Sequence, residues 1–176
     1  MLDFDKTLTP GDIEGGIVNV VVEIPTGSLN KIEWHREKAT FQIDRVEPLE
    51  FSEPSNYGFI PRTLNEDGDE LDVLIISEES IPTGTVLKAK IIGVMKFDDE
   101  GKTDDKVLVV PIDNQSNDNT INTTSDISKQ KIDQITNYFT HYKDMTKPNS
   151  TIVMGWGDVS EAKNIIYKSI KRWENQ

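Results

Sequence analysis

The segment that most constrains this chain is residues 67–73, which read D-G-D-E-L-D-V. Three aspartates fall within six residues, around a glycine and directly before the apolar run 73–76. Carboxylates this close repel one another at neutral pH, and bound divalent cations commonly offset that repulsion. Asp72 adjoins the apolar run, where an unpaired carboxylate is costly. The segment therefore favours a metal site at the mouth of a β-strand.

Two simpler interpretations account for less of the segment. An Asp-Gly turn between strands explains its first two residues but not Asp69 and Asp72. An EF-hand loop that starts at Asn65 would need a glycine and a glutamate at the positions where Glu70 and Ile76 stand. A metal site of a different design remains the better interpretation.

A second acidic cluster follows at residues 98–105 and ends at Lys106. Asp99 and Asp104 flank Gly101 in what we expect to be a hairpin loop. A lone acidic loop of this kind is usually solvated. If a barrel mouth brings it next to residues 67–73, the two clusters form a multi-metal site of oxygen ligands, which suits phosphoryl chemistry.

Composition narrows the function classes. The chain has 176 residues, which predicts one domain over residues 1–176. Its net charge of −12 argues against nucleic acid or an anionic membrane as the main partner. A small anionic substrate stays compatible where metals reverse the local field. With no cysteine and two histidines, thiolate catalysis and zinc ribbons are excluded. No secretion signal or 18-residue apolar run occurs, so a cytoplasmic protein is expected.

The first two-thirds of the chain has β-type patterns separated by turn residues. Strands are predicted at residues 17–25, 31–34, 40–46, 71–77, 86–97 and 106–111. Many short strands at this spacing favour a small closed barrel. Residues 56–59, which lie between two prolines, are interpreted as an aromatic loop that packs on the barrel.

The last third changes period. Residues 114–126 are rich in Asn, Ser, Thr and Asp, which predicts a loop. Apolar residues then recur at helical spacing over 127–142, with Ser125 or Asp126 as the expected N-cap. Residues 147–149 break that helix, and a last helix carries an apolar stripe over 162–173. The fold class is therefore mainly β with C-terminal α.

Several polar residues in these elements have a structural interpretation beside a functional one. Those in the predicted strands are Glu23, Lys31, Glu33 and Arg45. Lys31 and Glu33 share a strand face, and an exposed ladder of ion pairs would explain them. Near the end of the first predicted helix, Tyr142 would belong to the core and Lys143 would complement the helix dipole.

Taken in order, these motifs resemble the family I soluble inorganic pyrophosphatases. The D-G-D-E-L-D-V segment is the most specific of them. The others are V-E-I-P with Glu23, K-I-E with Lys31 and Glu33, I-D-R with Arg45, N-Y-G with Tyr57, the segment from Asp99 through Asp104 to Lys106, and H-Y-K-D with Tyr142 and Lys143. The resemblance spans roughly residues 17–157.

The resemblance implies an OB-like five-stranded closed barrel plus two helices. It implies Mg²⁺-dependent hydrolysis of pyrophosphate to two orthophosphates, by a homo-oligomer that is often a hexamer in bacterial relatives of this length. By the same resemblance, the metal ligands are Asp67, Asp72, Asp99 and Asp104, and Asp69 is the catalytic carboxylate that helps to deprotonate the attacking water. The phosphate-holding residues are Lys31, Arg45, Tyr57, Lys106, Tyr142 and Lys143, and Glu23 and Glu33 are ligands for metals that arrive with substrate.

The sequence departs from the family pattern at three places. Glu53 stands where a tyrosine is common, and its carboxylate would weaken phosphate affinity or shift the pH profile if it points into the site. Met154 replaces a frequent glutamate, and the Asn-rich segment 113–126 differs from many relatives. Two other functions stay open: a metal-dependent hydrolase of nucleotides or polyphosphates, and an OB-like binding module that has lost catalysis.

Overall fold

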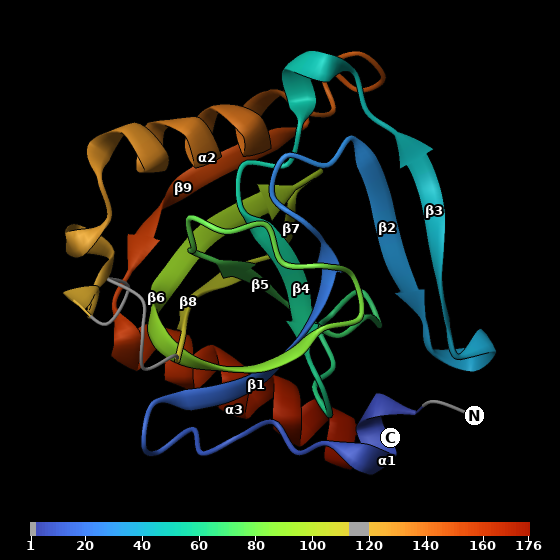
Figure 1. Ribbon diagram of the computed structural model, residues 1–176, viewed down its shortest axis with the longest axis vertical. Helices are drawn as coiled ribbons and strands as arrows, with labels where there is room; N and C mark the ends of the chain where they lie inside the picture. Colours follow the sequence, from blue (N-terminus) through green and yellow to red (C-terminus); the bar gives the residue numbers. More distant parts are fainter. Residues whose placement is uncertain (1–2, 113–119) are drawn as a thin grey trace.

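The computed structural model describes residues 3–112 and 120–176, and its centre is a closed ring of five strands (Figure 1). In ring order the strands are β1 (Ile17–Ile24), β4 (Asn56–Ile60), β5 (Leu71–Ile75), β8 (Lys106–Pro111) and β6 (Val86–Asp99), and β6 pairs back with β1. All neighbours are antiparallel except β5 and β8, which run parallel. The predicted mainly-β class and closed five-stranded arrangement are confirmed.

The ring closes because β6 is long and bends. This strand of 14 residues pairs with β1 over its first part, and with β8 and β9 (Thr151–Gly157) over its later part. The bend lies at Gly93, which has φ of +156° and marks a register shift against β8. A Cβ at Gly93 would lie 2.6 Å from the carbonyl oxygen of Gly157, so only glycine permits this close approach.

Two of the longer strands differ from the sequence prediction. Residues 56–59 belong to β4, which is buried along its whole length instead of forming a loop. The flanking Pro54 and Pro61 and the internal Gly58 read as turn signals, but Gly58 is needed because a Cβ there would lie 2.1 Å from the carbonyl oxygen of Val21. Strand β9 was not predicted, since it follows a helix-breaking segment and contains Gly155.

The helices lie where the sequence places them, with one boundary corrected. Helix α2 (Lys129–His141) begins at the N-cap Ser128, whose hydroxyl accepts from the backbone of Lys131. The predicted caps lie too early, since Asp126 instead forms a capping box with Thr123 around the short turn η4 (Thr124–Asp126). Residues 114–119 of the predicted loop are outside the described residues. Helix α3 (Val159–Glu174) has a capping box of its own.

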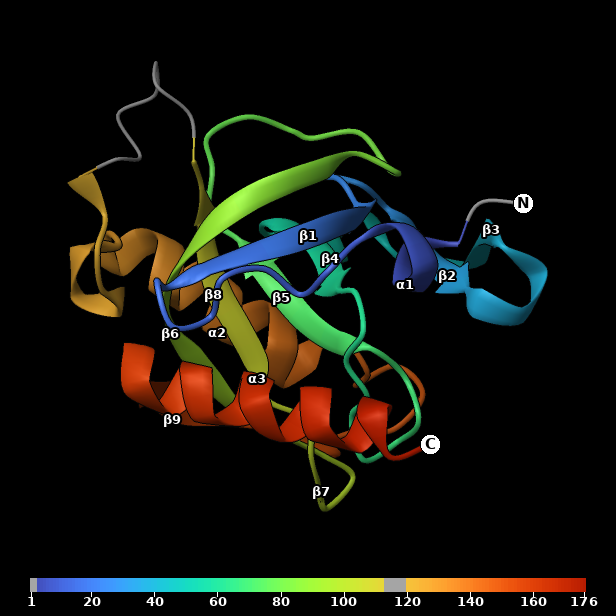
Figure 2. The same cartoon turned by 90° about the horizontal axis from the view of Figure 1, so that it is seen from below.

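Each long helix covers a separate apolar cluster. Helix α3 buries Ala162 and Ile166 in the cluster that contains Val73 and Ile91, and it lies across the lower side of the molecule in Figure 2. Helix α2 packs beside β9 and buries Phe139 in the second cluster. No helix in the described part of the chain is long and apolar enough to cross a membrane.

Beside the strand ring stands a separate two-stranded hairpin (Figure 1). It consists of β2 (Asn30–His35) and β3 (Thr40–Val46), joined by the turn η1 (Arg36–Lys38). Phe4, from the short helix α1 (Phe4–Thr7), lies 4.7 Å from Trp34 and 6.0 Å from Phe59 between ring centroids. These aromatic contacts attach the hairpin to β4.

Two short elements complete the fold. The turn η2 (Leu49–Phe51) leads into β4, and β7 (Lys102–Thr103) forms a small hairpin with the end of β6.

Candidate active site

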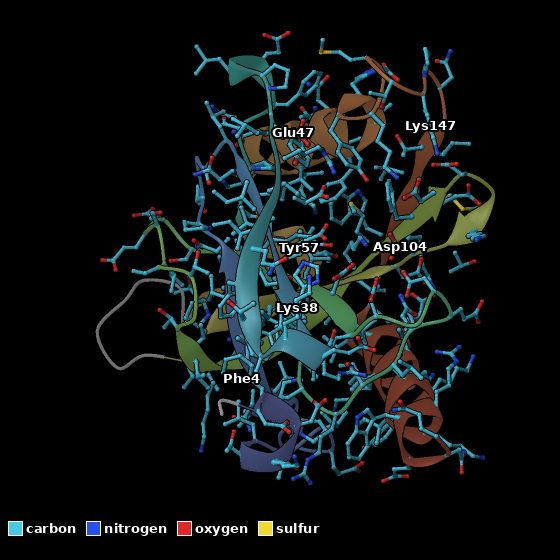
Figure 3. All side chains as sticks on the ribbon, turned by 90° about the vertical axis from the view of Figure 1, so that its right-hand side faces the viewer. Phe4, Lys38, Glu47, Tyr57, Asp104 and Lys147 are labelled. Atoms are coloured by element: carbon cyan, nitrogen blue, oxygen red, sulfur yellow. The ribbon has the colours of Figure 1, made fainter. Side chains whose placement is uncertain are left out.

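One cavity of about 270 Å³ lies between the strand ring, the β2–β3 hairpin and helix α2. Every site residue named from the sequence lines it: Glu23, Lys31, Glu33, Arg45, Tyr57, Asp67, Asp69, Asp72, Asp99, Asp104, Lys106, Tyr142 and Lys143. Figure 3 shows Tyr57 near the middle of the view, between the hairpin and Asp104. Residues spread over 121 positions of the chain, from 23 to 143, therefore meet around one space.

Lys106 joins two aspartates on the strand-ring side of the cavity. Its ammonium nitrogen lies 2.5 Å from Asp72 Oδ2 and 2.6 Å from Asp104 Oδ2. The parallel pairing of β5 with β8 brings them together, because Val73 lies opposite Val107. Burial alone would lower the pKa of Lys106, but the two carboxylates outweigh it and hold that pKa above its usual range. The lysine therefore stays charged although only 3% of it is exposed.

The β6–β7 hairpin presents the second acidic cluster. Asp99 Oδ2 accepts from the ammonium of Lys143 at 2.5 Å, and the backbone N–H of Asp104 donates to the carbonyl of Phe97 at 2.8 Å. Asp105, which the sequence did not single out, fixes this geometry. Its buried carboxylate accepts from the backbone N–H of Phe97 at 3.0 Å and from the ammonium of Lys96 at 3.2 Å.

Asp69 lies in the loop that carries the D-G-D-E-L-D-V motif. Its backbone N–H donates to Asp67 Oδ1 at 3.1 Å, and its carbonyl accepts from the N–H of Asn65 at 2.7 Å. The turn passes through Gly68 with φ of +99°. Burial raises the pKa of Asp69, and Asp67 and Asp72 raise it further. This aspartate therefore binds a proton more readily than an exposed one does.

The neighbouring Glu70 ties this loop to the β2–β3 hairpin. Its carboxylate accepts from Arg36 Nε at 2.9 Å, and the same guanidinium lies 3.1 Å from Asp5 Oδ2. Arg36 is in η1, between the two strands of the hairpin. One arginine thus links helix α1, the hairpin and the acidic loop.

The hairpin supplies cations to the cavity. Lys31 and Arg45 are cross-strand partners on β2 and β3. The ammonium of Lys31 lies 4.8 Å from the centre of the Tyr57 ring, whereas Arg45 pairs with Asp44 at 2.8 Å and Glu47 at 2.6 Å. The exposed ladder of ion pairs considered from the sequence describes Arg45 in part, but both cations line the cavity.

Three more predicted residues, Glu23, Tyr57 and Tyr142, are polar groups that are buried or partly buried. Glu23 Oε1 accepts from the backbone N–H of Trp34 at 2.7 Å, and burial together with the nearby Asp72 raises the pKa of Glu23 to about 8. Burial also raises the pKa of Tyr57 and of Tyr142 above the usual range. The two phenols therefore keep their O–H groups as hydrogen-bond donors at neutral pH.

Glu53, the departure noted in the sequence, also lines this cavity. Its Oε2 accepts from the hydroxyl of Tyr138 at 3.0 Å. Tyr138 and Phe139 of α2 line the cavity too, although their helical spacing indicated only core positions. Helix periodicity finds a buried face but does not show that a hydroxyl at its edge reaches a site.

The acidic side chains fit a hard divalent cation in their chemistry. Asp99 Oδ1 and Asp104 Oδ1 are buried and have no hydrogen-bond partner, which is costly for carboxylate oxygens. Oxygen ligands of this kind suit Mg²⁺. Across residues 3–112 and 120–176, however, no three acidic or histidine side chains stand ready around one metal position. Lys106 and Lys143 hold the other oxygens, so metal binding requires these contacts to rearrange.

Comparisons with known proteins agree along the chain. A family model described as "Inorganic pyrophosphatase" matches residues 20–174. The chain is 56% identical over 176 residues to an inorganic pyrophosphatase of Neisseria meningitidis serogroup B, covering 100% of this chain and 99% of that protein. It is 55% identical over 176 residues to one of Haemophilus influenzae, covering 100% of each.

A solved structure shows the same similarity in three dimensions. The crystal structure of an inorganic pyrophosphatase from Neisseria gonorrhoeae superposes with a TM-score of 0.95 at 55% identity, covering 98% of this chain and 99% of that chain. The family match over residues 20–174 contains every residue that lines the cavity.

Proposed function

Because the chain belongs to the inorganic pyrophosphatase family, we propose that it hydrolyses pyrophosphate to two orthophosphates with Mg²⁺ as the cofactor. The observation that carries this proposal is the cavity, which has carboxylates on one side and lysines, an arginine and tyrosines around the rest. Such a cavity suits a small polyanion that binds together with cations. Its volume of about 270 Å³ favours a compact substrate over a nucleotide.

The aspartates are the proposed metal ligands. Asp67, Asp72, Asp99 and Asp104 would hold Mg²⁺, and Glu23 and Glu33 would hold further ions that arrive with substrate. When bound, such ions lower the pKa of water and neutralise phosphate charge. The two orphaned oxygens of Asp99 and Asp104 support this assignment, since a cation would satisfy both.

Asp69 is the proposed proton acceptor. As the water oxygen bonds to one phosphorus, its proton passes to the Asp69 carboxylate, the bridging P–O bond breaks, and the second phosphate leaves with the electron pair. The raised pKa of Asp69 supports this role, because a more basic carboxylate accepts the proton more readily. No covalent bond to the enzyme is needed.

Cations and phenols would hold the two phosphates. The residues are Lys31, Arg45, Tyr57, Lys106, Tyr142 and Lys143. Lys106 and Lys143, which contact aspartates in this structure, would turn toward phosphate oxygens once pyrophosphate binds. Neutralisation of the leaving phosphate is the main electrostatic task of this set.

Phosphate release from pyrophosphate, measured with Mg²⁺ and again with excess chelator, tests the proposal. We expect rapid release with Mg²⁺ and its loss in chelator. A panel of nucleoside triphosphates and polyphosphate, tested in parallel, separates the proposal from a broader phosphohydrolase. A folded protein that binds pyrophosphate but never releases phosphate would instead be a binding module.

The wider setting is also proposed. We infer one domain over residues 1–176, a cytoplasmic location, no nucleic-acid or membrane partner, and a homo-oligomer, with a hexamer implied by resemblance. Exposed apolar side chains such as Ile43, Leu49 and Met154 offer surface for contacts between subunits. Sedimentation of the purified protein tests the oligomer, and a purely monomeric sample would contradict it.

A further inference from the structure

Glu53 has a fixed backbone and a cavity-facing side chain. Its backbone N–H donates to the carbonyl of Ser28 at 2.9 Å, and its carbonyl accepts from the N–H of Gly27 at 2.8 Å. The backbone carbonyl oxygen of the next residue, Pro54, accepts a hydrogen bond from the ammonium of Lys131 at 2.7 Å. Only 4% of Glu53 is exposed, and the residue lines the cavity. The backbone of Glu53 is therefore held in place, and its buried carboxyl group faces the cavity.

One oxygen of this carboxyl group lacks a partner. Oε2 accepts from the hydroxyl of Tyr138 at 3.0 Å, whereas Oε1 is buried and has no hydrogen bond among the described residues. An unsatisfied buried oxygen is costly unless a ligand or a proton meets it. Because the residue lines the cavity, a polar ligand in that space is the natural partner.

The ammonium group of Lys31 forms no ion pair with a carboxylate of the described residues. It lies over the Tyr57 ring, 4.8 Å from the ring centre, and no carboxylate of the described chain lies within 4.0 Å of it. Lys31 and Glu53 therefore do not form an ion pair, although both line the same cavity. A phosphate oxygen in this space can accept from both groups only if Glu53 carries a proton.

The charges around Glu53 allow that protonation near neutral pH. Burial raises the pKa of Glu53 to about 7, with a smaller rise from Glu47, which follows β3. Lys31 on β2, the hydroxyl of Tyr138 on α2 and Lys106 on β8 lower it. The carboxyl group is thus neutral in a large share of molecules at pH 7.

We propose that Glu53 is a pH-dependent phosphate-binding residue, which as a neutral acid donates a hydrogen bond from Oε1 to pyrophosphate and as a carboxylate repels it. This inference rests on the proposed pyrophosphate hydrolysis and adds a specific binding group to it. Substrate affinity falls as Glu53 loses its proton. Binding of the polyanion also raises the pKa of Glu53, so substrate binding takes up protons above pH 7.

The Michaelis constant for pyrophosphate across pH 6 to 8.5, at saturating Mg²⁺, tests this inference. Glu53→Gln keeps the shape of the side chain and supplies a permanent N–H donor, but it cannot ionise. Pyrophosphate and Mg²⁺ titrate identically for both proteins, so the ratio of the two constants isolates Glu53. We expect the wild-type constant to rise roughly tenfold relative to that of Glu53→Gln over this range, equivalent to about 1.4 kcal/mol. Parallel profiles would overturn the proposal.

A second variant separates binding from a merely structural role. Tyr138→Phe removes the hydroxyl that stabilises the Glu53 carboxylate, so the pKa of Glu53 rises and the loss of affinity moves to higher pH. A structural defect would change affinity equally at every pH. Glu50→Gln, at a nearby exposed carboxylate in η2, is the matched control and should leave the profile unchanged.

Calorimetric binding of methylenediphosphonate, which is not hydrolysed, keeps the two proposals distinguishable. Titrations at pH 8 in buffers of different ionisation enthalpy report proton uptake, and we expect less uptake by Glu53→Gln than by wild type. Equal uptake contradicts the role of Glu53 even if pyrophosphate is hydrolysed. Diphosphonate binding with proton uptake, but with no hydrolysis of pyrophosphate, overturns the proposed function and leaves Glu53 as a phosphate-binding group.

Discussion

The two sides of the cavity are built in opposite ways. On the strand-ring side, Asp72 and Asp104 meet the buried Lys106, and the backbone of β5 and β8 is hydrogen-bonded within the sheet. On the hairpin side, Arg45 has 40% of its side chain exposed and pairs with carboxylates of its own chain segment. The first side is built into the sheet, and its lysine offsets part of the carboxylate charge, whereas the second side stands apart from the sheet.

Under the proposed function, this difference would separate two tasks. Carboxylates that share metals must keep their spacing to within a fraction of an ångström, and a sheet interior provides that rigidity. Cations that hold a substrate must admit and release it. The hairpin is attached by aromatic contacts, by Arg36 and by the hydrogen bond from Trp34 to Glu23, without sheet pairing to the ring, and this leaves it more room for movement. We therefore expect substitutions on the ring side to affect the rate and the fold, and those on the hairpin side to affect substrate affinity.

The largest effect is expected at Asp69, on the ring side. Asp69→Asn keeps the size of the side chain but removes the proposed proton acceptor, so turnover should fall roughly 10²- to 10⁴-fold. Metal binding, measured by calorimetry with Mg²⁺, should change little because Asp69 is not a proposed ligand. Glu66→Gln, at an exposed carboxylate in the same loop, is the control. Near-normal turnover in Asp69→Asn would remove this residue from the chemistry.

Lys106→Met tests directly how much the buried lysine stabilises the two aspartates that it contacts. It leaves Asp72 and Asp104 close together without their shared cation, and loss of one partner from a buried pair costs about 3–5 kcal/mol. Urea unfolding in chelator should show this loss, and added Mg²⁺ should recover part of it.

The matched control for that prediction is Lys143→Met. Lys143 pairs with Asp99, but its side chain is 24% exposed, so the same change should cost about 1 kcal/mol or less. Equal losses of unfolding free energy in the two lysine variants would contradict the difference between a buried ion pair and a partly exposed one.

The sequence could predict the groups around the cavity but not their pairing. The resemblance carried by the motif order named residues that line one cavity, and the two-residue period placed Lys31 and Glu33 on a shared face. The contact between Lys106 and Asp72 joins residues 34 positions apart, and it depends on the parallel pairing of β5 with β8. No local pattern encodes that pairing, because parallel neighbours are chosen by the whole fold.

Strand β1 was predicted from its alternating side chains in the sequence, and β5 and β8 from their apolar runs. Strand β4 was missed because it sits between prolines and contains Gly58, so its local signals are those of a turn. Likewise, the 85-residue separation of Glu53 and Tyr138 hides their hydrogen bond from the sequence. Glu53 was recognised as unusual, but its buried state required the fold.

Glu53 lies where the two sides meet, and its burial predicts a pH-dependent stability. Its pKa rises from 4.5 in the unfolded chain to about 7 in the fold, so the folded state binds its proton more tightly. The contribution of Glu53 to the free energy of unfolding is therefore complete below pH 4.5 and is lost as the pH rises through 7. The change is about 3 kcal/mol. Glu53→Gln lacks this titration.

Urea unfolding of wild type and Glu53→Gln at pH 5 and pH 8, with metal chelated, checks the direction of this pH dependence of stability. The variant should gain stability relative to wild type as the pH rises, by up to about 3 kcal/mol. Other titrating groups cancel in the difference between the two proteins. A constant difference at both values would mean that the carboxyl group of Glu53 is not protonated preferentially in the folded state.

The smallest effect, and the sharpest test of the hairpin side, is expected at Arg36. Arg36→Gln breaks the link from the hairpin to Glu70 in the acidic loop, so the cations of the hairpin should hold substrate less firmly. Because the pair is partly exposed, we expect about 1 kcal/mol, seen as a roughly fivefold rise in KM with kcat nearly unchanged.

Two further variants decide whether that link is specific. Combining Arg36→Gln with Glu70→Gln in a double-mutant cycle should give a total smaller than the sum of the single effects, since both remove the same contact. Arg172→Gln breaks a comparable exposed pair with Glu66 on the same loop, but Arg172 lies in α3, not in the hairpin. It should leave KM unchanged. If Arg172→Gln raised KM as much as Arg36→Gln, the acidic loop as a whole would control affinity, and the division between a rigid side and a movable side would fail.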